Sequence, residues 1–276
     1  MKEKPRRDRG RAPVVCSIGS TDPTAGAGLF LDADVYARLD VRAVFVVAGI
    51  TAQNSTHVSR VEALTPVSIV AQMDAIWEQV RPDAVRIGLI PSRQAAVAVA
   101  RTLRALARRP QIVFDPVLAA TSGRRLIPAD DLRGVRALMR VATVITPNVA
   151  EAQVLTGIDI RTRADAERAA RMLSKRYDCA VLVKGGHLRA GDRVVDVLAR
   201  RDRVNSFAAR RLRGGGDARG TGCMLAAALA AGLARGYTLD RAVRTARRFV
   251  SDAITSATPL GAGRKQFGAG VARKAV

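Results

Sequence analysis

Residues 14–49 read VVCSIGSTDPTAGAGLFLDADVYARLDVRAVFVVAG, in which two short apolar runs, 14–20 and 43–49, flank a glycine-rich loop and a helical stretch to Leu39. Both runs are rich in β-branched residues and show no polar alternation, which is typical of strands buried on both faces. A buried strand, a helix and a second buried strand predict a βαβ unit with parallel strands.

The same alternation continues to the end of the chain. Further strands are predicted at 84–89, 111–116, 142–148 and 180–186, with amphipathic helices at 68–80 and 93–107. Segments 193–200 and 204–212 are expected to pair as an antiparallel edge, and helices at about 221–235 and 239–256 to complete the fold. We therefore predict an α/β fold in three layers, with a mostly parallel central sheet flanked by helices.

Length and composition favour one globular domain. No long Pro/Gly/Ser-rich linker divides the 276 residues, so we expect a disordered basic tail at 1–12 and a single domain at 13–276. The net charge of +22 raises nucleic acid or an acidic membrane surface as partners. However, 40 of the 46 basic residues are arginines, and no zinc finger, basic zipper or aromatic-basic RNA motif accompanies them. We therefore favour arginines on solvated helix faces over a nucleic-acid role.

The cysteines and the apolar runs indicate a location. Cys16, Cys179 and Cys223 are too few and too scattered for a disulfide framework or a CxxC metal site, which fits a reducing cytoplasm. The charged N-terminus has no long apolar stretch behind it, and the longest small apolar run, around 227–234, is too short to cross a bilayer. We expect a cytoplasmic protein without a membrane partner.

The glycine-rich and polar segments follow the predicted strands. In a parallel sheet, ligands bind outside the carboxyl ends of the strands, where these loops meet at one rim. The loops in question read SIGSTDPTAGAG, GITAQN, IGLIPS, DPVLAATSG, TPNVAEA and KGGH.

GTGC at 220–223 opens a predicted helix. The unpaired backbone N–H groups of a helix start and the positive end of its dipole suit a phosphate. The same field would stabilise a Cys223 thiolate, which could accept a proton from a substrate hydroxyl. Alternatively, Cys223 is a small buried apolar residue and the glycines belong to an ordinary loop.

Three further residues are open to two interpretations. Asn148 and Glu151 stand one helical turn apart and could face one metal or phosphate, or they could be an N-cap and its first-turn glutamate. Lys184 could neutralise phosphate charge or could simply be solvated at a strand end. Neither a Walker A motif nor a GxGxxG after the first strand is present, and the two histidines exclude a histidine-rich metal site.

Taken together, these motifs resemble a known family. DPTAGAGLFLDADVYARL, GITAQN, RIGLIPS, DPVLAATSG, TPNVAEA, VLVKGGH and GTGC occur in the order and approximate spacing of the hydroxymethylpyrimidine and phosphomethylpyrimidine kinases of thiamine biosynthesis. These kinases belong to the ribokinase-like superfamily, and the resemblance covers roughly residues 13–258. TAQN, KGGH and GTGC together are specific for this branch, because the sugar kinases usually have an aspartate at the position of Cys223.

The resemblance implies a role for each site residue. Asp32 and Gln53 would hydrogen-bond the aminopyrimidine ring, although on their own they would read as a helix-face aspartate and a loop glutamine. Leu89 would line the ring pocket, where methionine is more usual. The resemblance further implies that Asp115, Asn148 and Glu151 organise Mg²⁺, that Lys184 meets the ATP phosphates, and that the amides of Gly220, Thr221, Gly222 and Cys223 hold the transferring phosphoryl group. Cys223 would also take the hydroxyl proton.

Three positions depart from the family pattern. Thr121 replaces a lysine expected in a mobile flap, so that one phosphate contact is in doubt, and Arg124 or Arg125 would have to supply the charge. Arg219 replaces a histidine just before GTGC, and Ala25 replaces the first glycine of a GGAG.

We therefore expect an ATP- and Mg²⁺-dependent kinase that phosphorylates 4-amino-5-hydroxymethyl-2-methylpyrimidine and then its monophosphate, and, as in relatives, a homodimer. Two alternatives stay open. The first is pyridoxal or pyridoxine kinase, since vitamin B6 is also a flat heterocycle bearing a hydroxymethyl group. The second is a non-catalytic ligand sensor or nucleic-acid-binding protein built on the same fold.

Overall fold

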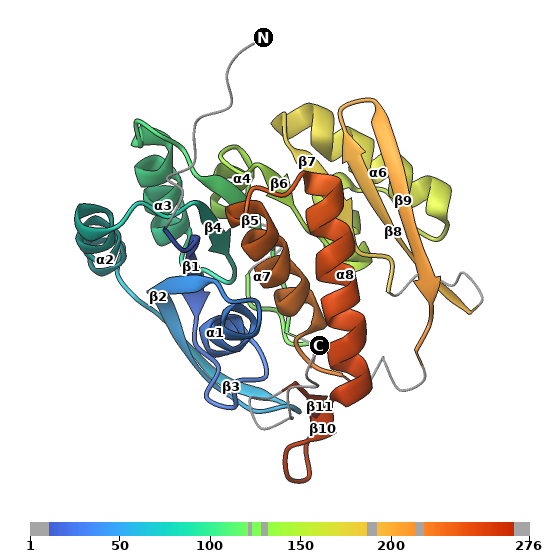
Figure 1. The fold of residues 1–276 in the computed structure, drawn as a ribbon, viewed down its shortest axis with the longest axis horizontal. Helices are drawn as coiled ribbons and strands as arrows, with labels where there is room; N and C mark the ends of the chain where they lie inside the picture. Colours follow the sequence, from blue (N-terminus) through green and yellow to red (C-terminus); the bar gives the residue numbers. More distant parts are fainter. Residues whose placement is uncertain (1–10, 121–122, 128–131, 187–191, 213–217, 268–276) are drawn as a thin grey trace.

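The computed structural model describes residues 11–120, 123–127, 132–186, 192–212 and 218–267. A nine-stranded sheet runs through the middle of the molecule in the order β3-β2-β1-β4-β5-β6-β7-β8-β9 (Figure 1). Its strands are β1 (Val14–Ser20), β2 (Arg42–Gln53), β3 (Val58–Ala63), β4 (Ala84–Ile87), β5 (Gln111–Phe114), β6 (Val144–Ile145), β7 (Ala180–Val183), β8 (Arg193–Arg200) and β9 (Arg203–Arg210). The helices are α1 (Gly28–Arg38), α2 (Pro66–Gln79), α3 (Arg93–Ala105), α4 (Arg133–Met139), α5 (Val149–Thr156), α6 (Arg163–Tyr177), α7 (Thr221–Ala234) and α8 (Leu239–Ser256).

The sheet is parallel in its centre and antiparallel at its edges. β2, β1, β4, β5, β6 and β7 pair in parallel, whereas β3 runs antiparallel to β2 at one edge and β8 and β9 run antiparallel at the other. This arrangement confirms the predicted mostly parallel sheet and the predicted pairing of the 193–200 and 204–212 segments.

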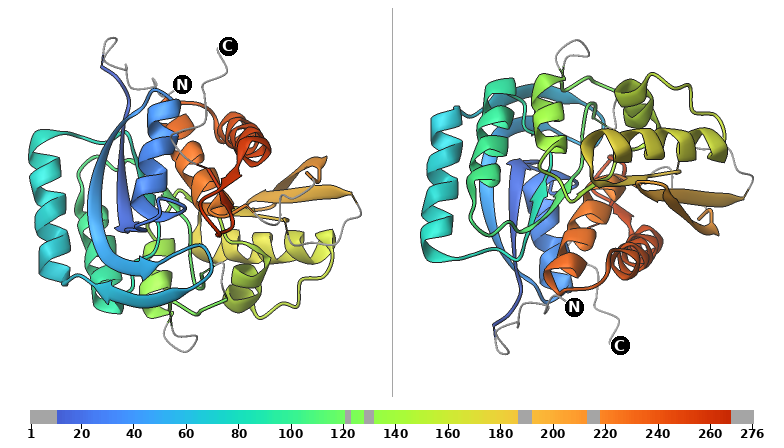
Figure 2. Two further views of the ribbon diagram at one scale, coloured as in Figure 1. Left: turned by 90° about the horizontal axis from the view of Figure 1, so that it is seen from below. Right: turned by 90° about the horizontal axis from the view of Figure 1, so that it is seen from above.

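Helices cover both faces of the sheet and form two apolar cores. α1, α7 and α8 pack on one face, where α1 contributes Leu31 and Val35 to the core, while α2 to α6 pack on the other face against residues such as Ile18 and Ile87 (Figure 2). Because each central strand is covered twice, its apolar residues are continuous rather than alternating. The three-layer prediction is confirmed.

Helix α7 is the central helix of its layer. Every residue from Met224 to Ala234 is buried, and alanine predominates among them. Such a helix has no polar face because the sheet and its neighbours α1 and α8 surround it. Its first turn therefore has a fixed position at the carboxyl ends of the strands.

The edge strand β3 and a short hairpin near the end of the chain were missing from the prediction. β2 extends to Gln53 because β3 pairs with its end, and Asn54 shapes the turn between them by accepting hydrogen bonds from the backbone N–H groups of Thr56 and His57. The alternation in VSRVEA is weak and most of the strand is exposed, so its pattern resembles a loop. A small hairpin of β10 (Thr258–Pro259) and β11 (Lys265–Gln266) was also missed.

Among the residues that the structure describes, no helix has both the length and the apolarity needed to span a membrane. The proposed tail lies almost wholly in residues 1–10, outside the described part of the chain, so the division at residues 12 and 13 stays a prediction.

Candidate active site

A cleft of about 2100 Å³ opens at the carboxyl ends of the parallel strands. It brings together most residues that the sequence singled out, although they come from both halves of the chain. Its lining includes Gln53, Leu89, Asp115, Asn148, Glu151, Lys184, Gly220, Thr221, Gly222 and Cys223. Asp32 is not part of this lining, because its side chain is fully buried behind the wall of the cleft.

The start of helix α7 forms one end of the cleft. Gly220 is the N-cap residue with a left-handed φ of +79°, and no side chain caps the helix. The first N–H groups of a helix have no partner within it, so the amides after Gly220 are available to an anion. A Cβ at position 220 would overlap the carbonyl oxygen of Gly26, so only glycine allows this loop to rest on the loop before α1.

Cys223 lines the cleft in the first turn of α7. The backbone N–H of Gly28 donates a hydrogen bond to it, while burial raises the pKa of the thiol and the Arg86 guanidinium is the largest opposing influence. Burial thus works against the thiolate expected from the helix dipole. The resting group is therefore a thiol, although the Arg86 guanidinium and the Gly28 amide favour its thiolate form.

Asp115 and Lys184 form the charged floor of the cleft. Lys184 Nζ lies 2.7 Å from Asp115 Oδ1, which also accepts a hydrogen bond of 3.0 Å from Thr146 Oγ1. Although burial opposes ionisation, Lys184 and Arg86 lower the pKa of Asp115, so this carboxylate is charged. A Cβ at Gly222 would lie 3.1 Å from Lys184 Nζ, so the ammonium group sits against the first turn of α7.

Asn148 and Glu151 combine both interpretations. They form a capping box at the start of α5, in which Glu151 N donates to Asn148 Oδ1 at 2.9 Å and Asn148 N donates to Glu151 Oε2 at 2.7 Å. Both residues also face the cleft. Burial, followed by the repulsion of Asp115, raises the pKa of Glu151, although Lys184 works in the opposite direction. A bound cation would relieve this repulsion.

The donor set fits a magnesium ion held partly by phosphate. Mg²⁺ usually takes one or two carboxylates from the protein and completes its shell with water and substrate phosphates. Asp115 and Glu151 supply that number. Within the described ranges, no group of three or more His, Cys, Asp or Glu residues is arranged for a metal, so a closed all-protein site is not formed there.

Gln53 and Leu89 also line the cleft, whereas Asp32 is buried outside its lining. Asp32 Oδ2 accepts a hydrogen bond of 2.9 Å from Ser17 Oγ, whereas its Oδ1 has no hydrogen-bond partner. Burial raises the pKa of Asp32 to about 6, against the effects of Arg86 and Ser17. Gln53 lines the cleft at the end of β2, and the carbonyl of Leu89 accepts a hydrogen bond from Ser20 Oγ at 3.0 Å.

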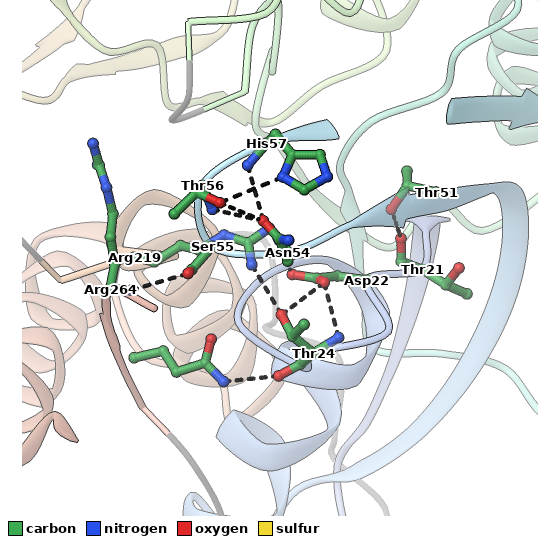
Figure 3. A network of polar contacts seen from close by, with 11 residues as sticks. Thr21, Asp22, Thr24, Thr51, Asn54, Ser55, Thr56, His57, Arg219 and Arg264 are labelled. Atoms are coloured by element: carbon green, nitrogen blue, oxygen red, sulfur yellow. Dashed lines mark hydrogen bonds and ion pairs between the residues drawn. The ribbon is translucent and has the colours of Figure 1, made fainter. Parts of the chain in front are cut away.

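Arg219 joins the glycine loops on the rim (Figure 3). Its guanidinium lies 2.9 Å from Asp22 Oδ2 and donates a hydrogen bond of 2.9 Å to Thr24 Oγ1, while its backbone N–H donates to Lys265 O. The hairpin after α8 completes the network, because Gln266 Nε2 donates to the carbonyl of Thr24. Arg219 thus links segments almost 200 positions apart in the chain.

The other two departures are placed differently. Ala25 has a left-handed φ of +53°, a conformation that suits the glycine usual at this position. Thr121 lies outside the described residues. Of the two arginines that could compensate for it, Arg124 donates to the carbonyls of Val58 and Ser59 in β3, whereas Arg125 lines the cleft.

Sequence reasoning missed Arg86 and Thr146. Arg86 is only 1% exposed and lies at the centre of the sheet, between Asp32 and Asp115. A signal was present, because an arginine inside the apolar run AVRIGL is a charge in a buried strand and therefore needs buried partners. Thr146 gave no comparable signal.

A family model described as Phosphomethylpyrimidine kinase matches residues 22–268. The chain belongs to this family. It is 38% identical over 253 residues to the hydroxymethylpyrimidine/phosphomethylpyrimidine kinase of Rhizobium meliloti (strain 1021), which covers 91% of this chain and 94% of that protein.

Two solved structures support the ribokinase-like fold, and the first of them also supports the family. The phosphomethylpyrimidine kinase of Clostridium difficile 630 superposes with a TM-score of 0.77 at 29% identity, covering 88% of this chain and all of that one. An ADP complex of Bacillus subtilis pyridoxal kinase reaches a TM-score of 0.85 at 25% identity and covers 95% and 98% of the two chains. Membership of this kinase family implies that the protein uses ATP.

Proposed function

We propose that this chain transfers a phosphoryl group from ATP to the hydroxymethyl group of 4-amino-5-hydroxymethyl-2-methylpyrimidine, and then phosphorylates the monophosphate. The observation that carries the proposal is one cleft lined by a thiol on an uncapped helix start, a half-buried lysine and two carboxylates. Family membership supports the same substrate class.

Asp32 and Gln53 are proposed to read the ring. A flat aminopyrimidine presents adjacent donors and acceptors, which a carboxyl group and an amide can match. Asp32 Oδ1 is buried without a hydrogen-bond partner, so it has an unused acceptor position. Leu89 supplies an apolar surface for the ring in the cleft.

Catalysis would depend mainly on position and charge. The amides of Thr221, Gly222 and Cys223 point to where an anion would lie, and Lys184 adds a positive charge beside them. Cys223, in its thiolate form, would accept the proton of the attacking hydroxyl, and Arg86 would stabilise that thiolate. Little covalent chemistry by the protein is needed.

Two bound groups complete the proposal. ATP would supply the phosphoryl group, and Mg²⁺ would neutralise the charge of its phosphates. Asp115 and Glu151 are the carboxylates that would hold the metal, and Asn148, Lys184 and Thr221 the groups that would meet the nucleotide.

Pyridoxal or pyridoxine kinase is the second candidate, because the Bacillus subtilis pyridoxal kinase shares this fold over nearly the whole chain. Asp32 and Gln53 favour the aminopyrimidine. The charged groups that line the cleft argue against a non-catalytic or nucleic-acid-binding role. Side-by-side turnover of the pyrimidine and pyridoxal with ATP separates the first two candidates.

We propose that the protein is cytoplasmic and forms a homodimer. Light scattering coupled to size exclusion gives the mass of the particle directly. A mass equal to that of one chain at micromolar concentration would contradict the dimer.

The direct test of function is ADP release in the presence of Mg²⁺, ATP and the hydroxymethylpyrimidine, with mass spectrometry of the product. We expect a monophosphate followed by a diphosphate. Turnover of pyridoxal with none of the pyrimidine would replace the first candidate with the second.

A further inference from the structure

The position of Arg86 links the two ends of the cleft. Strand register pairs Arg86 of β4 with Ser17 of β1, on the face of the sheet covered by α1 and α7. Its Nη1 lies 3.3 Å from Asp32 Oδ2 and its Nη2 lies 3.5 Å from Asp115 Oδ2. One buried cation therefore stands between the proposed ring-reading carboxyl group and the proposed phosphate-side carboxylate.

Packing fixes the guanidinium in this position. A Cβ at Gly88 would overlap Nη1 and lie 2.8 Å from Cζ, so the guanidinium rests directly on the backbone just after the end of β4. A guanidinium presents its N–H donors in a rigid planar fork, whereas the ammonium group of lysine is a point charge on a flexible stem. The Nε atom has no hydrogen-bond partner, so the side chain is held by its two charged neighbours and by contact with Gly88.

The titratable groups around Arg86 come from every neighbouring element. Asp32 and Tyr36 face it from α1, Asp115 from the end of β5, and Cys223 from α7. Tyr36 and Asp32 are also joined through Ser17, whose Oγ lies 2.9 Å from Asp32 Oδ2 and 2.9 Å from Tyr36 Oη. Without the guanidinium, two buried carboxylates and a thiol would share this space with Lys184 as the remaining cation beyond Asp115.

We propose that Arg86 is a positioning residue for the phosphoryl transfer, which holds the side chains of Asp32 and Asp115 at a fixed separation and places its positive charge near Cys223. The expected effect of Arg86 on kcat/KM rests on the proposed function. Its electrostatic effect does not rest on that function, because the charge acts on Cys223 in the free protein.

The electrostatic consequence is tested by alkylation of Cys223 with iodoacetamide across a range of pH. Peptide mass spectrometry assigns the reaction to Cys223, since Cys16 and Cys179 are buried. An opposite charge within a few ångströms shifts a pKa by about 1–3 units. We therefore expect the midpoint of alkylation to move upward by at least about one pH unit in Arg86→Met and less in Arg86→Lys.

The kinetic consequence is tested by pH profiles of kcat/KM for the same variants. Arg86→Met should lower kcat/KM by about 100-fold, the effect expected for a lost preorganised charge, and should move the acidic limb upward as Asp32 becomes harder to ionise. Arg86→Lys should recover part of the loss. Arg101→Met, on an exposed position of α3, is the matched control and should behave as the wild type.

The outcomes separate the two proposals. An unchanged alkylation midpoint in both Arg86 variants, confirmed as folded by circular dichroism, overturns the inference. A shifted midpoint in a protein whose wild type phosphorylates no pyrimidine supports the charge assignment and rejects the proposed function. If Arg86→Met does not fold, the alkylation midpoint and pH profile of Arg86→Lys decide the matter, because a purely structural role would leave both unchanged.

Discussion

Gly220→Ala tests whether the two glycine loops must touch for the site to form. Alanine would keep a backbone that now has a φ of +79°, which costs about 1–2 kcal/mol for a residue with a Cβ. The added Cβ would also overlap the carbonyl oxygen of Gly26 and lie 2.7 Å from Leu31 Cδ2, so the loops would have to separate by about 1 Å. A displacement of this size reduces rates by about 100-fold when it affects the reacting groups.

Gly157→Ala is the matched control for this substitution. Gly157 has a φ of +75° at the end of α5, and a Cβ there would meet no atom within 4 Å. Both variants pay the conformational penalty, but only Gly220→Ala pushes the loops apart. Chemical denaturation should show a loss of about 1 kcal/mol for Gly157→Ala and about 2–4 kcal/mol for Gly220→Ala.

Steady-state kinetics then decides the question. We expect kcat/KM to fall by about 100-fold in Gly220→Ala and to stay within about twofold of wild type in Gly157→Ala. Equal activity of the two variants at a temperature where both are folded would refute the claim that contact between the loops places the amides of α7.

Three further predictions concern single side chains. Lys184→Met should lower kcat by about 100-fold because it removes the cation beside the start of α7, whereas Lys175→Met, at a surface pair with Asp202, should leave kcat unchanged; comparable losses in both would contradict the role of Lys184. Ala25→Gly should stabilise the protein by up to about 1 kcal/mol in thermal or urea unfolding because it relieves a φ of +53°, while a loss of stability would show that this backbone is not strained. Asp32→Asn should remove a pH dependence of stability between about pH 4 and 6. Because the pKa of Asp32 in the folded protein is raised to about 6, the folded protein binds more protons than the unfolded chain in this window. Wild-type stability should therefore fall by about 3 kcal/mol in total as the pH rises through it. Urea titrations of the two proteins at pH 4, 5, 6 and 7 measure the difference, and parallel curves would disprove the assignment.

The strand and helix pattern was readable because each core strand is short, apolar and followed by a loop that carries the polar residues. β1 was predicted with its observed limits, and α7 was recognisable because a helix of alanine and leucine without a polar face has to be central. β3 was missed because it is a mostly exposed edge strand, whose residues do not need to alternate.

The meeting of most candidate residues at one cleft was predictable from the sequence, whereas their electrostatics were less so. Lys184, Glu151 and Cys223 follow predicted strands or begin helices, so the topology alone brings them to one rim. The burial of Asp32 and the pairing of Arg86 depend on side chains from α1, β4 and β5 meeting inside the sheet face, which no local pattern contains. The effect of Arg219 likewise depends on the hairpin at β10 and β11, far along the chain.

The most direct measurement is the phosphate balance of one reaction: purified protein, Mg²⁺, ATP and 4-amino-5-hydroxymethyl-2-methylpyrimidine, compared with the Cys223→Ala variant. The account predicts ADP and phosphorylated pyrimidine in equal amounts from the wild type, and a large loss of rate in the variant. Failure of the wild type to exceed Cys223→Ala, in a preparation that binds ATP, would contradict the assignment of this cleft.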